Sequence, residues 1–314
     1  MKIITDKSSI NNSCYTIATI GYFDGIHLGH KKILNELVTQ ANNKGGKSIL
    51  ITFWPHPRNI LNPNTSVELL LSNTDKHQYL ERLGVDILYI IEFTIDFSKM
   101  SAQSFIESFI MQKLNINKLI IGYNHSFGHK REGNFSFLKH NKKKYNFEIQ
   151  EVKRKEIDDK LKISSSSIRE EIREGNVYNA NKMLGYKYYI KGEIIKGDGI
   201  GKKINYPTAN INPYENSKLI PGNGVYVSEV EMDGKKLNGM LNIGNRPTVD
   251  GKERRIELHI FNFNSIIYGK KLKISLITKI REEIKFNSLE KLKEQLIKDE
   301  IKSIKILNHE KIGN

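Results

Sequence analysis

The chain has 314 residues and a mass of 36.2 kDa, which is enough for about two domains at ~100–200 residues each. Its single cysteine excludes a disulfide scaffold and a cysteine-rich zinc site, its 38% hydrophobic content excludes a wholly disordered chain, and no apolar run reaches the ~18 residues of a transmembrane helix. The net charge of +15 does not by itself indicate a nucleic acid partner, because the lysines are scattered as compositional bias would leave them.

The N-terminal residues 1–7 turn polar too early to form the apolar core of a signal peptide. Together with the lack of a predicted membrane-spanning segment, this start indicates a cytoplasmic protein. We expect neither a membrane nor a nucleic acid as a partner.

Strands and helices alternate up to about residue 185. Short apolar runs predict strands, and apolar residues at helical spacing predict helices between them. Their order is strand 15–21, helix 30–44, strand 48–54, helix 75–83, strand 86–93, helix 101–114 and strand 118–122. This alternation predicts an α/β domain with a Rossmann-like parallel sheet and helices on both faces. Such sheets bind ligands at the carboxyl ends of their strands.

After residue 185 the apolar pattern changes to a period of two. It predicts strands at 188–195, 225–232, 236–243, 255–263 and 271–279, with Asp233-Gly234 as a hairpin turn between the second and the third. Five or six strands in this length predict a small antiparallel β-barrel. One amphipathic helix ends the chain, and its predicted apolar face contains Leu289, Leu292, Leu296, Ile297, Ile301 and Ile304. We therefore divide the chain into domains 1–184 and 185–314.

The first cluster of functional residues lies between the first predicted strand and the first helix, and reads Gly21-Tyr22-Phe23-Asp24-Gly25-Ile26-His27-Leu28-Gly29-His30. Glycines there permit a tight turn and a close approach of the backbone to a ligand, and a helix N-terminus suits a phosphate. His27 and His30 would project together and donate to oxygens that gain charge in phosphoryl or nucleotidyl transfer. The alternatives are a zinc pair, for which no further ligand is offered nearby, and a surface turn with two incidental histidines.

The second cluster is the serine run Ile163-Ser164-Ser165-Ser166-Ser167-Ile168-Arg169. Hydroxyl groups at a helix start can cap the helix and bind phosphate, and Ser167 with Glu170 resembles a capping box. Alone, such a run is more often a helix cap or a linker than a functional site. A serine-rich turn with arginine that follows His-x-Gly-His is, however, typical of adenylyl transfer. Segments 54–57 and 122–128 lie between the two clusters, each directly after a predicted strand.

The third cluster lies in the predicted barrel. The run Gly197-Asp198-Gly199-Ile200-Gly201 can wrap phosphates, and in Pro207-Thr208-Ala209-Asn210 the side chains of Thr208 and Asn210 offer oxygens to Mg²⁺. Glu257 lies between two apolar residues of a predicted strand, so its carboxylate points away from them. The residues alone leave two alternatives for Glu257, a general base and a merely solvated side chain. The chain has no Walker A sequence, so a kinase here would use another scheme.

In order and spacing, from Gly21 to the segment 281–286, these clusters resemble the bacterial bifunctional riboflavin kinase/FAD synthetases. The resemblance implies a HIGH-type nucleotidyltransferase fold with FMN adenylyltransferase activity for 1–184 and a riboflavin kinase barrel for 185–314. It implies catalytic roles for His27, His30 and Glu257. By position, it assigns nucleotide binding to Gly21, Phe23, Asp24, Gly25, Gly29, Ser164, Ser165, Ser166, Arg169, Gly197, Gly201, Thr208 and Asn210, flavin binding to Asn124, Phe127, Arg281 and Phe286, and Mg²⁺, held through ATP, to Thr208 and Asn210.

The implied chemistry has two steps. Riboflavin is phosphorylated by ATP to FMN with release of ADP, and FMN is then adenylylated by a second ATP to FAD with release of pyrophosphate. Glu257 would take the proton of the riboflavin 5′-hydroxyl, whereas the FMN phosphate is already an anion and needs no base. In the first domain, positioning and charge neutralisation by His27, His30, the helix dipole and Mg²⁺ would dominate. Three residues differ from the family pattern: His125, where an aromatic residue is usual, Lys202 and Asn205.

Two other classes of function stay open on the residues alone. A different adenylyltransferase, acting on pantetheine phosphate or on a nicotinamide nucleotide, would not need the Pro-Thr-Ala-Asn barrel. A basic, non-catalytic regulator that binds flavin or RNA would not need His27, His30 and Glu257. Product analysis after incubation with riboflavin and ATP separates the first class from the expected enzyme, and RNA binding at physiological salt tests the second.

Overall fold

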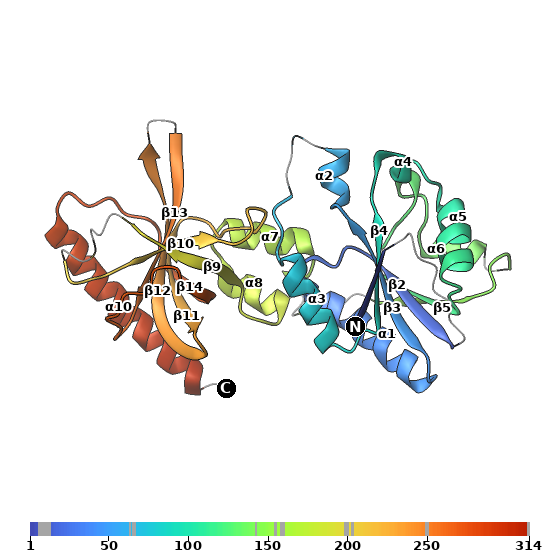
Figure 1. The fold of residues 1–314 in the computed structure, drawn as a ribbon, viewed down its shortest axis with the longest axis horizontal. Coiled ribbons are helices and arrows are strands. Elements are labelled where there is room, and N and C mark those ends of the chain that lie inside the picture. The colour runs from blue at the N-terminus through green and yellow to red at the C-terminus, as the bar shows by residue number, and fades with distance from the viewer. Residues whose placement is uncertain are drawn as a thin grey trace. The chain divides into compact units, whose positions relative to one another are not determined.

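A computed structural model of the chain describes residues 1–5, 14–62, 64, 67–141, 143–153, 156–157, 161–197, 201, 204–248 and 251–312. The chain forms two compact units, Met1–Ser165 and Ser166–Asn314. Figure 1 follows them from the blue N-terminus to the red C-terminus. Within the described residues, no helix combines the length and the apolar character needed to cross a membrane.

The first unit is built on a six-stranded sheet. Its strands lie in the order β1 (Lys2–Thr5), β4 (Ile87–Glu92), β3 (Lys47–Trp54), β2 (Thr16–Ile20), β5 (Lys118–Gly122) and β6 (Glu148–Val152). Every pairing in it is parallel, which confirms the predicted α/β fold. The sequence analysis missed β1 and β6, the two edge strands. They are hard to detect because β6 is mostly polar and β1 is only four residues long.

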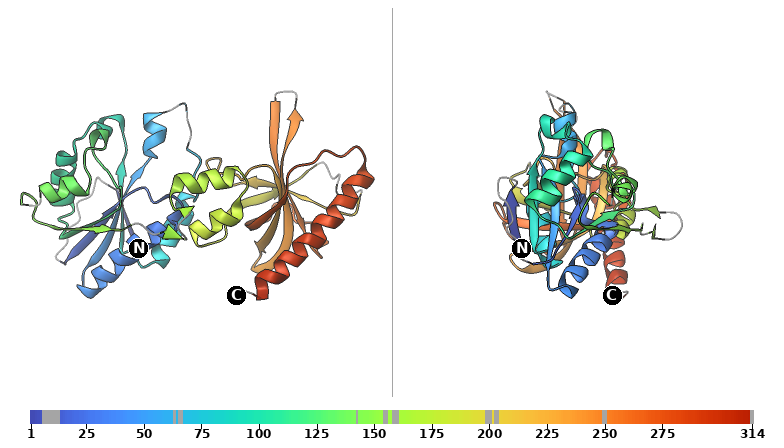
Figure 2. Two further views of the ribbon diagram at one scale, coloured as in Figure 1. Left: turned by 180° about the vertical axis from the view of Figure 1, so that it is seen from behind. Right: turned by 90° about the vertical axis from the view of Figure 1, so that its right-hand side faces the viewer.

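Helices cover both faces of this sheet (Figures 1 and 2). In chain order the elements between and after the strands are η1 (Asp24–Ile26), α1 (Leu28–Asn43), α2 (Pro57–Leu61), α3 (Asn73–Arg82), α4 (Ile95–Ser98), α5 (Ala102–Phe105), the π-helix η2 (Ile106–Lys113), η3 (His129–Arg131), α6 (Phe135–His140) and the two-residue strands β7 (Glu156–Ile157) and β8 (Leu161–Lys162). Leu34, Leu37 and Ala41 form the buried side of α1, which packs on β2 and β3.

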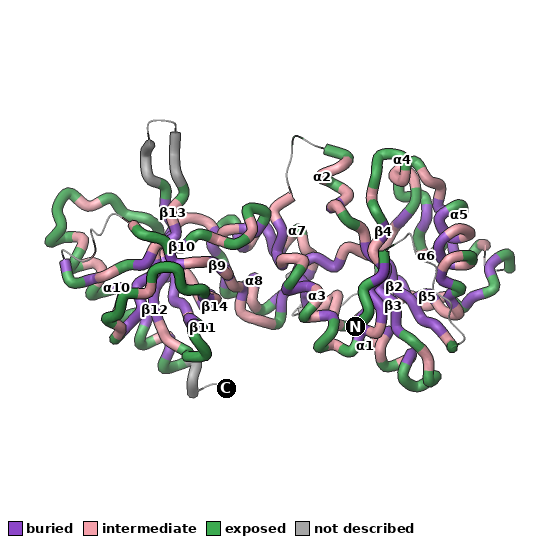
Figure 3. The backbone as a smooth tube through the Cα atoms, viewed as in Figure 1, coloured by how far each residue is buried: buried purple, intermediate pink, exposed green. Residues whose placement is uncertain are grey.

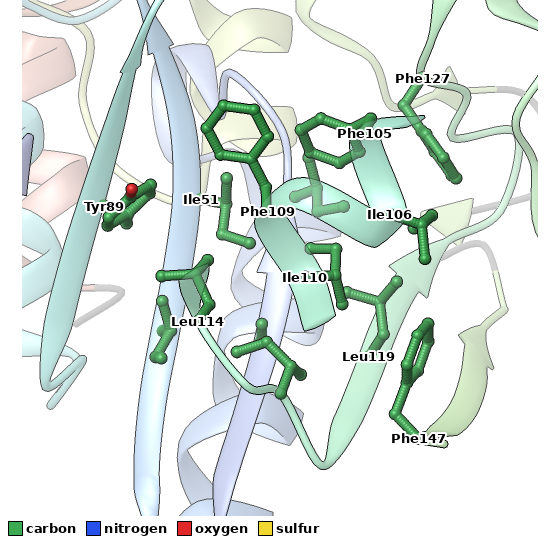
Figure 4. Close-up of a cluster of buried hydrophobic side chains, with 14 of the residues drawn as sticks. Ile51, Tyr89, Phe105, Ile106, Phe109, Ile110, Leu114, Leu119, Phe127 and Phe147 are labelled. Carbon is green, nitrogen blue, oxygen red and sulfur yellow. The ribbon is translucent and has the colours of Figure 1, made fainter. Parts of the chain in front are cut away.

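The segment predicted as one helix over 101–114 also packs on this sheet. It is α-helical only in α5 and continues as the π-helix η2. Phe105, Phe109, Ile110 and Leu114 of this segment belong to one buried cluster with Ile51 of the sheet (Figure 4). Phe105 and Ile110 are five residues apart, and so are Phe109 and Leu114. This spacing matches the i→i+5 hydrogen-bond step of a π-helix and keeps them on the side facing the sheet.

β2 lies at the centre of the sheet, where the direction of the chain changes. From β2 the chain passes through α1 to β3 on one side, whereas β5 pairs with the other side of β2. Open α/β sheets bind ligands at such a switch point, outside the carboxyl ends of the strands. The segment 21–30 leaves β2 there and the segment 123–128 leaves β5. The topology therefore places two of the singled-out segments at one edge of the sheet.

The second unit contains a closed antiparallel barrel, as predicted. Its strand order is β10 (Ala209–Pro213), β13 (Gly251–Ile260), β12 (Lys235–Thr248), β11 (Gly224–Met232), β14 (Lys271–Arg281) and β9 (Tyr189–Ile195), and β9 pairs with β10 to close it. Asp233 and Gly234 form the predicted hairpin turn between β11 and β12, with φ of 51° and 75°. β10 was not predicted as a strand because it is short and carries two asparagines and a proline.

Two helices, α7 (Ser165–Arg173) and α8 (Val177–Leu184), precede the barrel. The Asn181 amide donates to the Leu276 carbonyl at 2.8 Å and accepts from the Tyr188 backbone N–H at 2.6 Å, so α8 is joined to β14 and to the start of the barrel. α7 begins at Ser165. The predicted cap at Ser167 is therefore wrong, because Ser167 lies inside the first turn of the helix.

The terminal helix α10 (Leu289–Ile312) packs on the barrel with only part of its predicted face. Leu292 and Leu296 contact the barrel core, whereas Ile297, Ile301 and Ile304 are exposed. Figure 3 shows this mixture along α10. Each residue turns a helix by about 100°, so Leu296 and its neighbour Ile297 cannot share one narrow face. The prediction of a single face for all six residues is wrong.

Candidate active sites

The turn between β2 and α1 is tightly wound. Phe23, Gly25 and Ile26 all have positive φ, at 54°, 79° and 37°. Glycine adopts this conformation without steric cost, which explains Gly25. At Gly21, an added Cβ would come within 2.7 Å of the Phe23 ring. The predicted glycine positions therefore allow a compact turn at the carboxyl end of β2.

His27 and His30 lie together at the start of α1, as their spacing predicts. Their rings are stacked, with centroids 3.6 Å apart and planes inclined by 16°. His27 caps the helix, because its Nδ1 accepts a hydrogen bond from the His30 backbone N–H at 3.2 Å. In the neutral ring the proton then sits on Nε2. Phe23 also packs on the His30 ring, and a Cβ at Gly29 would lie only 3.2 Å from the His27 ring.

Burial keeps both imidazoles neutral. Desolvation lowers the pKa of His27 to about 4 and lowers the pKa of His30 well below its ordinary value, with further contributions from His27, Lys76 and His125. At neutral pH the pair can therefore donate hydrogen bonds but carries no positive charge. The Nδ1 atom of His30 is buried without a hydrogen-bond partner among the described residues. The contribution of these histidines to neutralising phosphate charge stays a prediction.

Asp24 stabilises the same turn through its carboxylate. Its side chain is buried, and its carboxylate accepts hydrogen bonds from the backbone N–H groups of Leu70, at 3.0 and 3.1 Å, and of Leu71, at 3.2 Å. These bonds tie the turn to the segment ahead of α3. A contact between Asp24 and a nucleotide stays a prediction.

The serine run reaches the first cluster through Ser165. Its hydroxyl donates to the Asp24 carbonyl oxygen at 3.0 Å, across 141 residues of sequence. Ser164 and Ser166 flank it at the start of α7, and Arg169 is a buried side chain one turn later in that helix. Ser165 thus links two of the predicted clusters, while nucleotide binding by the run stays a prediction.

The loop after β5 holds two predicted flavin residues of unlike character. Asn124 is exposed, with φ of 63°, whereas Phe127 is buried in the aromatic core against Phe105, with ring centroids 5.7 Å apart (Figure 4). Flavin contact stays a prediction for both residues. His125, between them, has a buried Nε2 atom without a partner among the described residues, and desolvation followed by the Arg131 charge lowers its pKa to about 4.

The sequence analysis missed Lys76, in the first turns of α3. Its side chain is 3% exposed, and Nζ lies 3.4 Å from the Tyr22 carbonyl oxygen and 4.2 Å from the centroid of the Tyr22 ring. That ring meets His56 edge-on, at 4.1 Å between centroids. Burial lowers the pKa of Lys76 to about 8, although Asp24 acts in the opposite direction. The available signal was spacing, because Lys76 precedes Leu80 by four residues and so lies on the apolar side of the predicted helix.

In the barrel, three polar side chains align across neighbouring strands. β13 pairs Glu257 with Asn210 of β10 on one side and with Asn242 of β12 on the other. Residues paired in this way share one face of the sheet. The Asn242 amide donates to Glu257 Oε2 at 3.4 Å. Ile256 and Leu258 are buried, so the half-buried Glu257 points to the opposite face, as its alternation with them predicts.

The predicted glycines of the barrel lie close to this set. At Gly197 an added Cβ would lie 1.8 Å from Asn210 Nδ2 and 3.5 Å from Oδ1, so the amide nitrogen faces Gly197 and the oxygen is turned away. At Gly201 a Cβ would lie 2.1 Å from the Tyr206 carbonyl oxygen, and the Gly201 carbonyl accepts from the Tyr206 N–H at 2.8 Å. Residues 198–200 and 202–203, including Lys202, lie outside the described residues.

Two cavities border β10. Gly197 and Asn210 line one of about 360 Å³. Thr208, which is exposed just before β10, lines another of about 140 Å³ together with Phe263 and Tyr268. The apolar and aromatic side chains of the second cavity suit a flat ring. His259 Nδ1, a positioning group that the sequence analysis missed, lies 2.9 Å from the Pro207 carbonyl oxygen and so holds the segment before Thr208.

Arg281 and Phe286, the other predicted flavin residues, are neighbours. The Arg281 guanidinium carbon lies 5.9 Å from the Phe286 ring centroid. The guanidinium is also paired with Asp299 of α10, with Nε–O distances of 2.8 and 3.1 Å, and Asp299 is buried. Arg281 therefore connects β14 to α10, and its contact with a flavin stays a prediction.

Asp299 is buried and Arg281 is partly exposed, so we expect Asp299→Asn to destabilise the second unit by about 1.5–3 kcal/mol, since Arg281 loses a hydrogen-bonded charge partner. Urea unfolding of the full chain, followed by circular dichroism, measures the change. The matched control is Glu231→Gln, which removes an exposed pair with Lys273 and should cost under about 1 kcal/mol. Equal losses for the two variants would contradict a structural role of the Asp299 pair.

The two sites differ in the chemistry that they can perform. The first offers neutral N–H donors and a helix N-terminus, which suit the oxygens of a phosphate ester. The second offers a carboxylate that can accept a proton, next to amide and hydroxyl groups that can bind a nucleotide. Among the described residues, no three histidine, cysteine or acidic side chains gather to hold a metal ion.

Comparison with known families gives one match for each part of the chain. The sequence model of the FAD synthetase family matches residues 9–167, and that of the riboflavin kinase family matches residues 184–307.

Several relatives match almost the whole chain, and each is named a bifunctional riboflavin kinase/FMN adenylyltransferase. The relative from Buchnera aphidicola is 40% identical, with 94% of this chain and 95% of the relative covered. Those from Bacillus subtilis and Escherichia coli K12 are 35% and 33% identical, covering 94% and 91% of this chain and 93% and 90% of the relatives. A crystal structure titled as a macrolide-efflux protein from Streptococcus pneumoniae superposes with a TM-score of 0.87 at 32% identity, covering 96% of this chain and 98% of that one.

Proposed function

The chain belongs to the family of bifunctional riboflavin kinase/FMN adenylyltransferases, and on this premise we propose that its two sites divide the two reactions between them. Residues 185–314 phosphorylate riboflavin to FMN. Residues 1–184 transfer the adenylyl group of a second ATP to FMN, which gives FAD and pyrophosphate. The observation that carries the proposal is that each compact unit has its own set of reactive side chains: His27 and His30 at a helix N-terminus in one, and Glu257 beside Asn210 in the other.

In the kinase reaction, Glu257 is the general base. Its carboxylate is oriented by the hydrogen bond from Asn242. It accepts the proton of the riboflavin 5′-hydroxyl while that oxygen bonds to the γ-phosphorus of ATP. The bond between the γ-phosphorus and the bridging oxygen breaks, and ADP leaves with the electron pair. The cavity beside Thr208 has the apolar lining that a nucleotide base needs.

The residues before and in β10 fit a magnesium ion bound with ATP. Mg²⁺ prefers oxygen ligands, and Thr208 and Asn210 supply a hydroxyl and an amide oxygen. The Asn210 amide nitrogen is turned toward Gly197 and its oxygen lies farther from that glycine, which is the orientation that ligation of a cation by the oxygen requires. When bound, the ion would offset part of the charge on the phosphates. Thr208, Asn210 and the glycine loop would hold the nucleotide whether or not the ion is bound.

In the adenylyl transfer, the nucleophile is a phosphate oxygen of FMN, which attacks the α-phosphorus of ATP. The bond from the α-phosphorus to its bridging oxygen breaks, and pyrophosphate leaves. No proton has to be removed, so the chain contributes alignment and hydrogen bonds. His27, with its proton on Nε2, donates to a phosphate oxygen, and the free N–H groups of α1 favour the same negative charge.

The proposed partners are therefore small molecules: riboflavin, FMN, FAD, ATP, ADP and pyrophosphate. We propose the cytoplasm as the place of action, because both reactions consume ATP. The net charge of +15 matches the polyanionic character of these ligands and requires neither nucleic acid nor a membrane.

The direct test is incubation of the chain with riboflavin, ATP and Mg²⁺, followed by chromatographic separation of riboflavin, FMN and FAD. FMN should appear first and FAD later. Supplying FMN in place of riboflavin should still give FAD. Formation of neither product would refute the proposal and would favour a binding protein instead.

The division of activities predicts the behaviour of fragments. A fragment that starts at Gly185 contains the barrel and α10 and should make FMN but no FAD. A fragment that starts at Ser166 should do the same with a higher thermal midpoint, because it retains Asn181 and its hydrogen bonds to Tyr188 and Leu276. Thermal unfolding by circular dichroism and an FMN assay measure both effects. A folded fragment without kinase activity would contradict the assignment.

A further inference from the structure

The β2–α1 turn contains a buried cation that the mechanism above does not use. Lys76 is 3% exposed, and removing an ammonium group from water is strongly unfavourable unless other interactions compensate. Among the described residues, the contacts of Nζ are the carbonyl oxygen and the ring of Tyr22. A carbonyl and an aromatic face stabilise a cation but do not cancel its charge.

The charged and titratable groups around Lys76 lie on η1, α1 and α3, and the negative charge of Asp24 offsets part of its positive charge. From η1, Asp24 attracts it, but the Asp24 carboxylate is already bonded to the Leu70 and Leu71 amides. From α1, His30 faces it and is neutral. On its own helix, His77 has a pKa lowered by burial and by the Lys76 charge, and Asp75 is buried.

The histidines, in contrast, are neutral at pH 7. Both have pKa values lowered by burial, and part of the shift at His30 comes from Lys76 itself. A site that binds two phosphorylated substrates needs positive potential, and a fixed cation in a water-poor site acts more strongly than one in solvent. The charge of Lys76 contributes to the lowered pKa of His30, so Lys76 is close enough to add positive potential at the histidine pair.

We propose that Lys76 is a positioning residue for adenylyl transfer, whose buried ammonium holds Tyr22 in the β2–α1 turn and supplies positive charge beside His30. The inference rests on the proposed function of the first unit. Lys76 acts through this turn, because the contacts of its Nζ atom are with the carbonyl oxygen and the ring of Tyr22. The ammonium fixes the backbone at Tyr22, directly after Gly21, and thus the geometry in which α1 and His27 meet a phosphate.

The first test is the pH dependence of FAD formation from supplied FMN and ATP. The pKa of Lys76 is about 8, so its charge is present below that pH and is lost above it. We expect the kcat for FAD formation by the wild-type chain to fall above about pH 8. The Lys76→Met variant should be about 10²-fold slower near pH 7 and should lack this alkaline decline. Lys76→Arg, which stays charged throughout, should also lack the decline but retain more activity.

The controls separate this inference from a folding defect and from the proposed function. Lys44→Met removes another lysine stacked over a tyrosine, Tyr15, in the same unit but at an exposed position, and should leave FAD formation unchanged. Circular dichroism checks the fold of each variant. If Lys76→Met does not fold, the alkaline decline of the wild type is compared with that of Lys76→Arg, and this comparison tests the inference. Near-normal FAD formation by folded Lys76→Met, or an unchanged alkaline decline in Lys76→Arg, would overturn the inference. A wild-type chain that makes no FAD would instead refute the function itself.

Discussion

FMN formation by the Glu257→Gln variant is expected to fall about 10²–10⁴-fold, because glutamine keeps the size and hydrogen bonding of glutamate but cannot accept a proton. The Asn242 amide that donates to Glu257 can still donate to the glutamine carbonyl oxygen, so the strand register and the fold should be preserved. ATP binding should change little, since the carboxylate serves the flavin hydroxyl. The measurement is the initial rate of FMN production from riboflavin at saturating ATP.

The internal control for this variant is FAD formation from supplied FMN, which should survive because the first unit performs it. The matched control is Glu231→Gln, which removes a carboxylate from another barrel strand, β11, where it pairs with Lys273. That variant should retain normal kinase turnover. If Glu257→Gln also turned over riboflavin at the normal rate, Glu257 would be a solvated side chain outside the mechanism.

The second large effect is expected for His30→Ala. Loss of one preorganised donor to a developing charge typically slows a reaction about 10²–10³-fold, so FAD formation should fall by that factor. FMN formation from riboflavin should be nearly intact. Because the His30 ring stacks on His27 and packs on Phe23, its removal also leaves space in the turn. His30→Asn, which retains an N–H donor, should therefore recover part of the rate.

His140→Ala is the matched control, because His140 is exposed on α6 in the same unit. It should leave both activities unchanged. Equal loss of FMN and FAD formation in His30→Ala would point to a shared site or to a general folding defect, and would remove the separate role of His30 in adenylyl transfer.

Much of the fold follows from the local pattern of the sequence. The apolar runs that became β3, β4 and β5 are buried on both faces, and such strands read as continuous apolar segments. The strands of the barrel read as alternation with period two, and Asp233-Gly234 adopts the positive φ values that its residue types favour. The strands that the sequence analysis missed are the edge strands β1 and β6 and the strand β10, where few side chains are buried and the pattern is weak.

The candidate sites divide in the same way. His27 and His30 are three residues apart at the start of one helix, so their spacing alone predicts that their rings lie together. Glu257 could be assigned to a face from its two apolar neighbours. Its partner Asn242 and its strand neighbour Asn210 could not be identified, because strand order and register depend on closure of the whole barrel.

The sequence by itself determined the two fold classes and the residue types of both sites, because periodicity, turn chemistry and motif spacing act over a few neighbouring residues. The tertiary structure alone decided which residues are buried together. In the folded chain, burial lowers the pKa of His27 and Asp24 accepts hydrogen bonds from backbone amides. Arg281 pairs with Asp299, and the buried Lys76 contacts the Tyr22 ring. Charge state and solvation depend on groups that are distant in sequence, and only packing brings those groups within a few ångströms of one another.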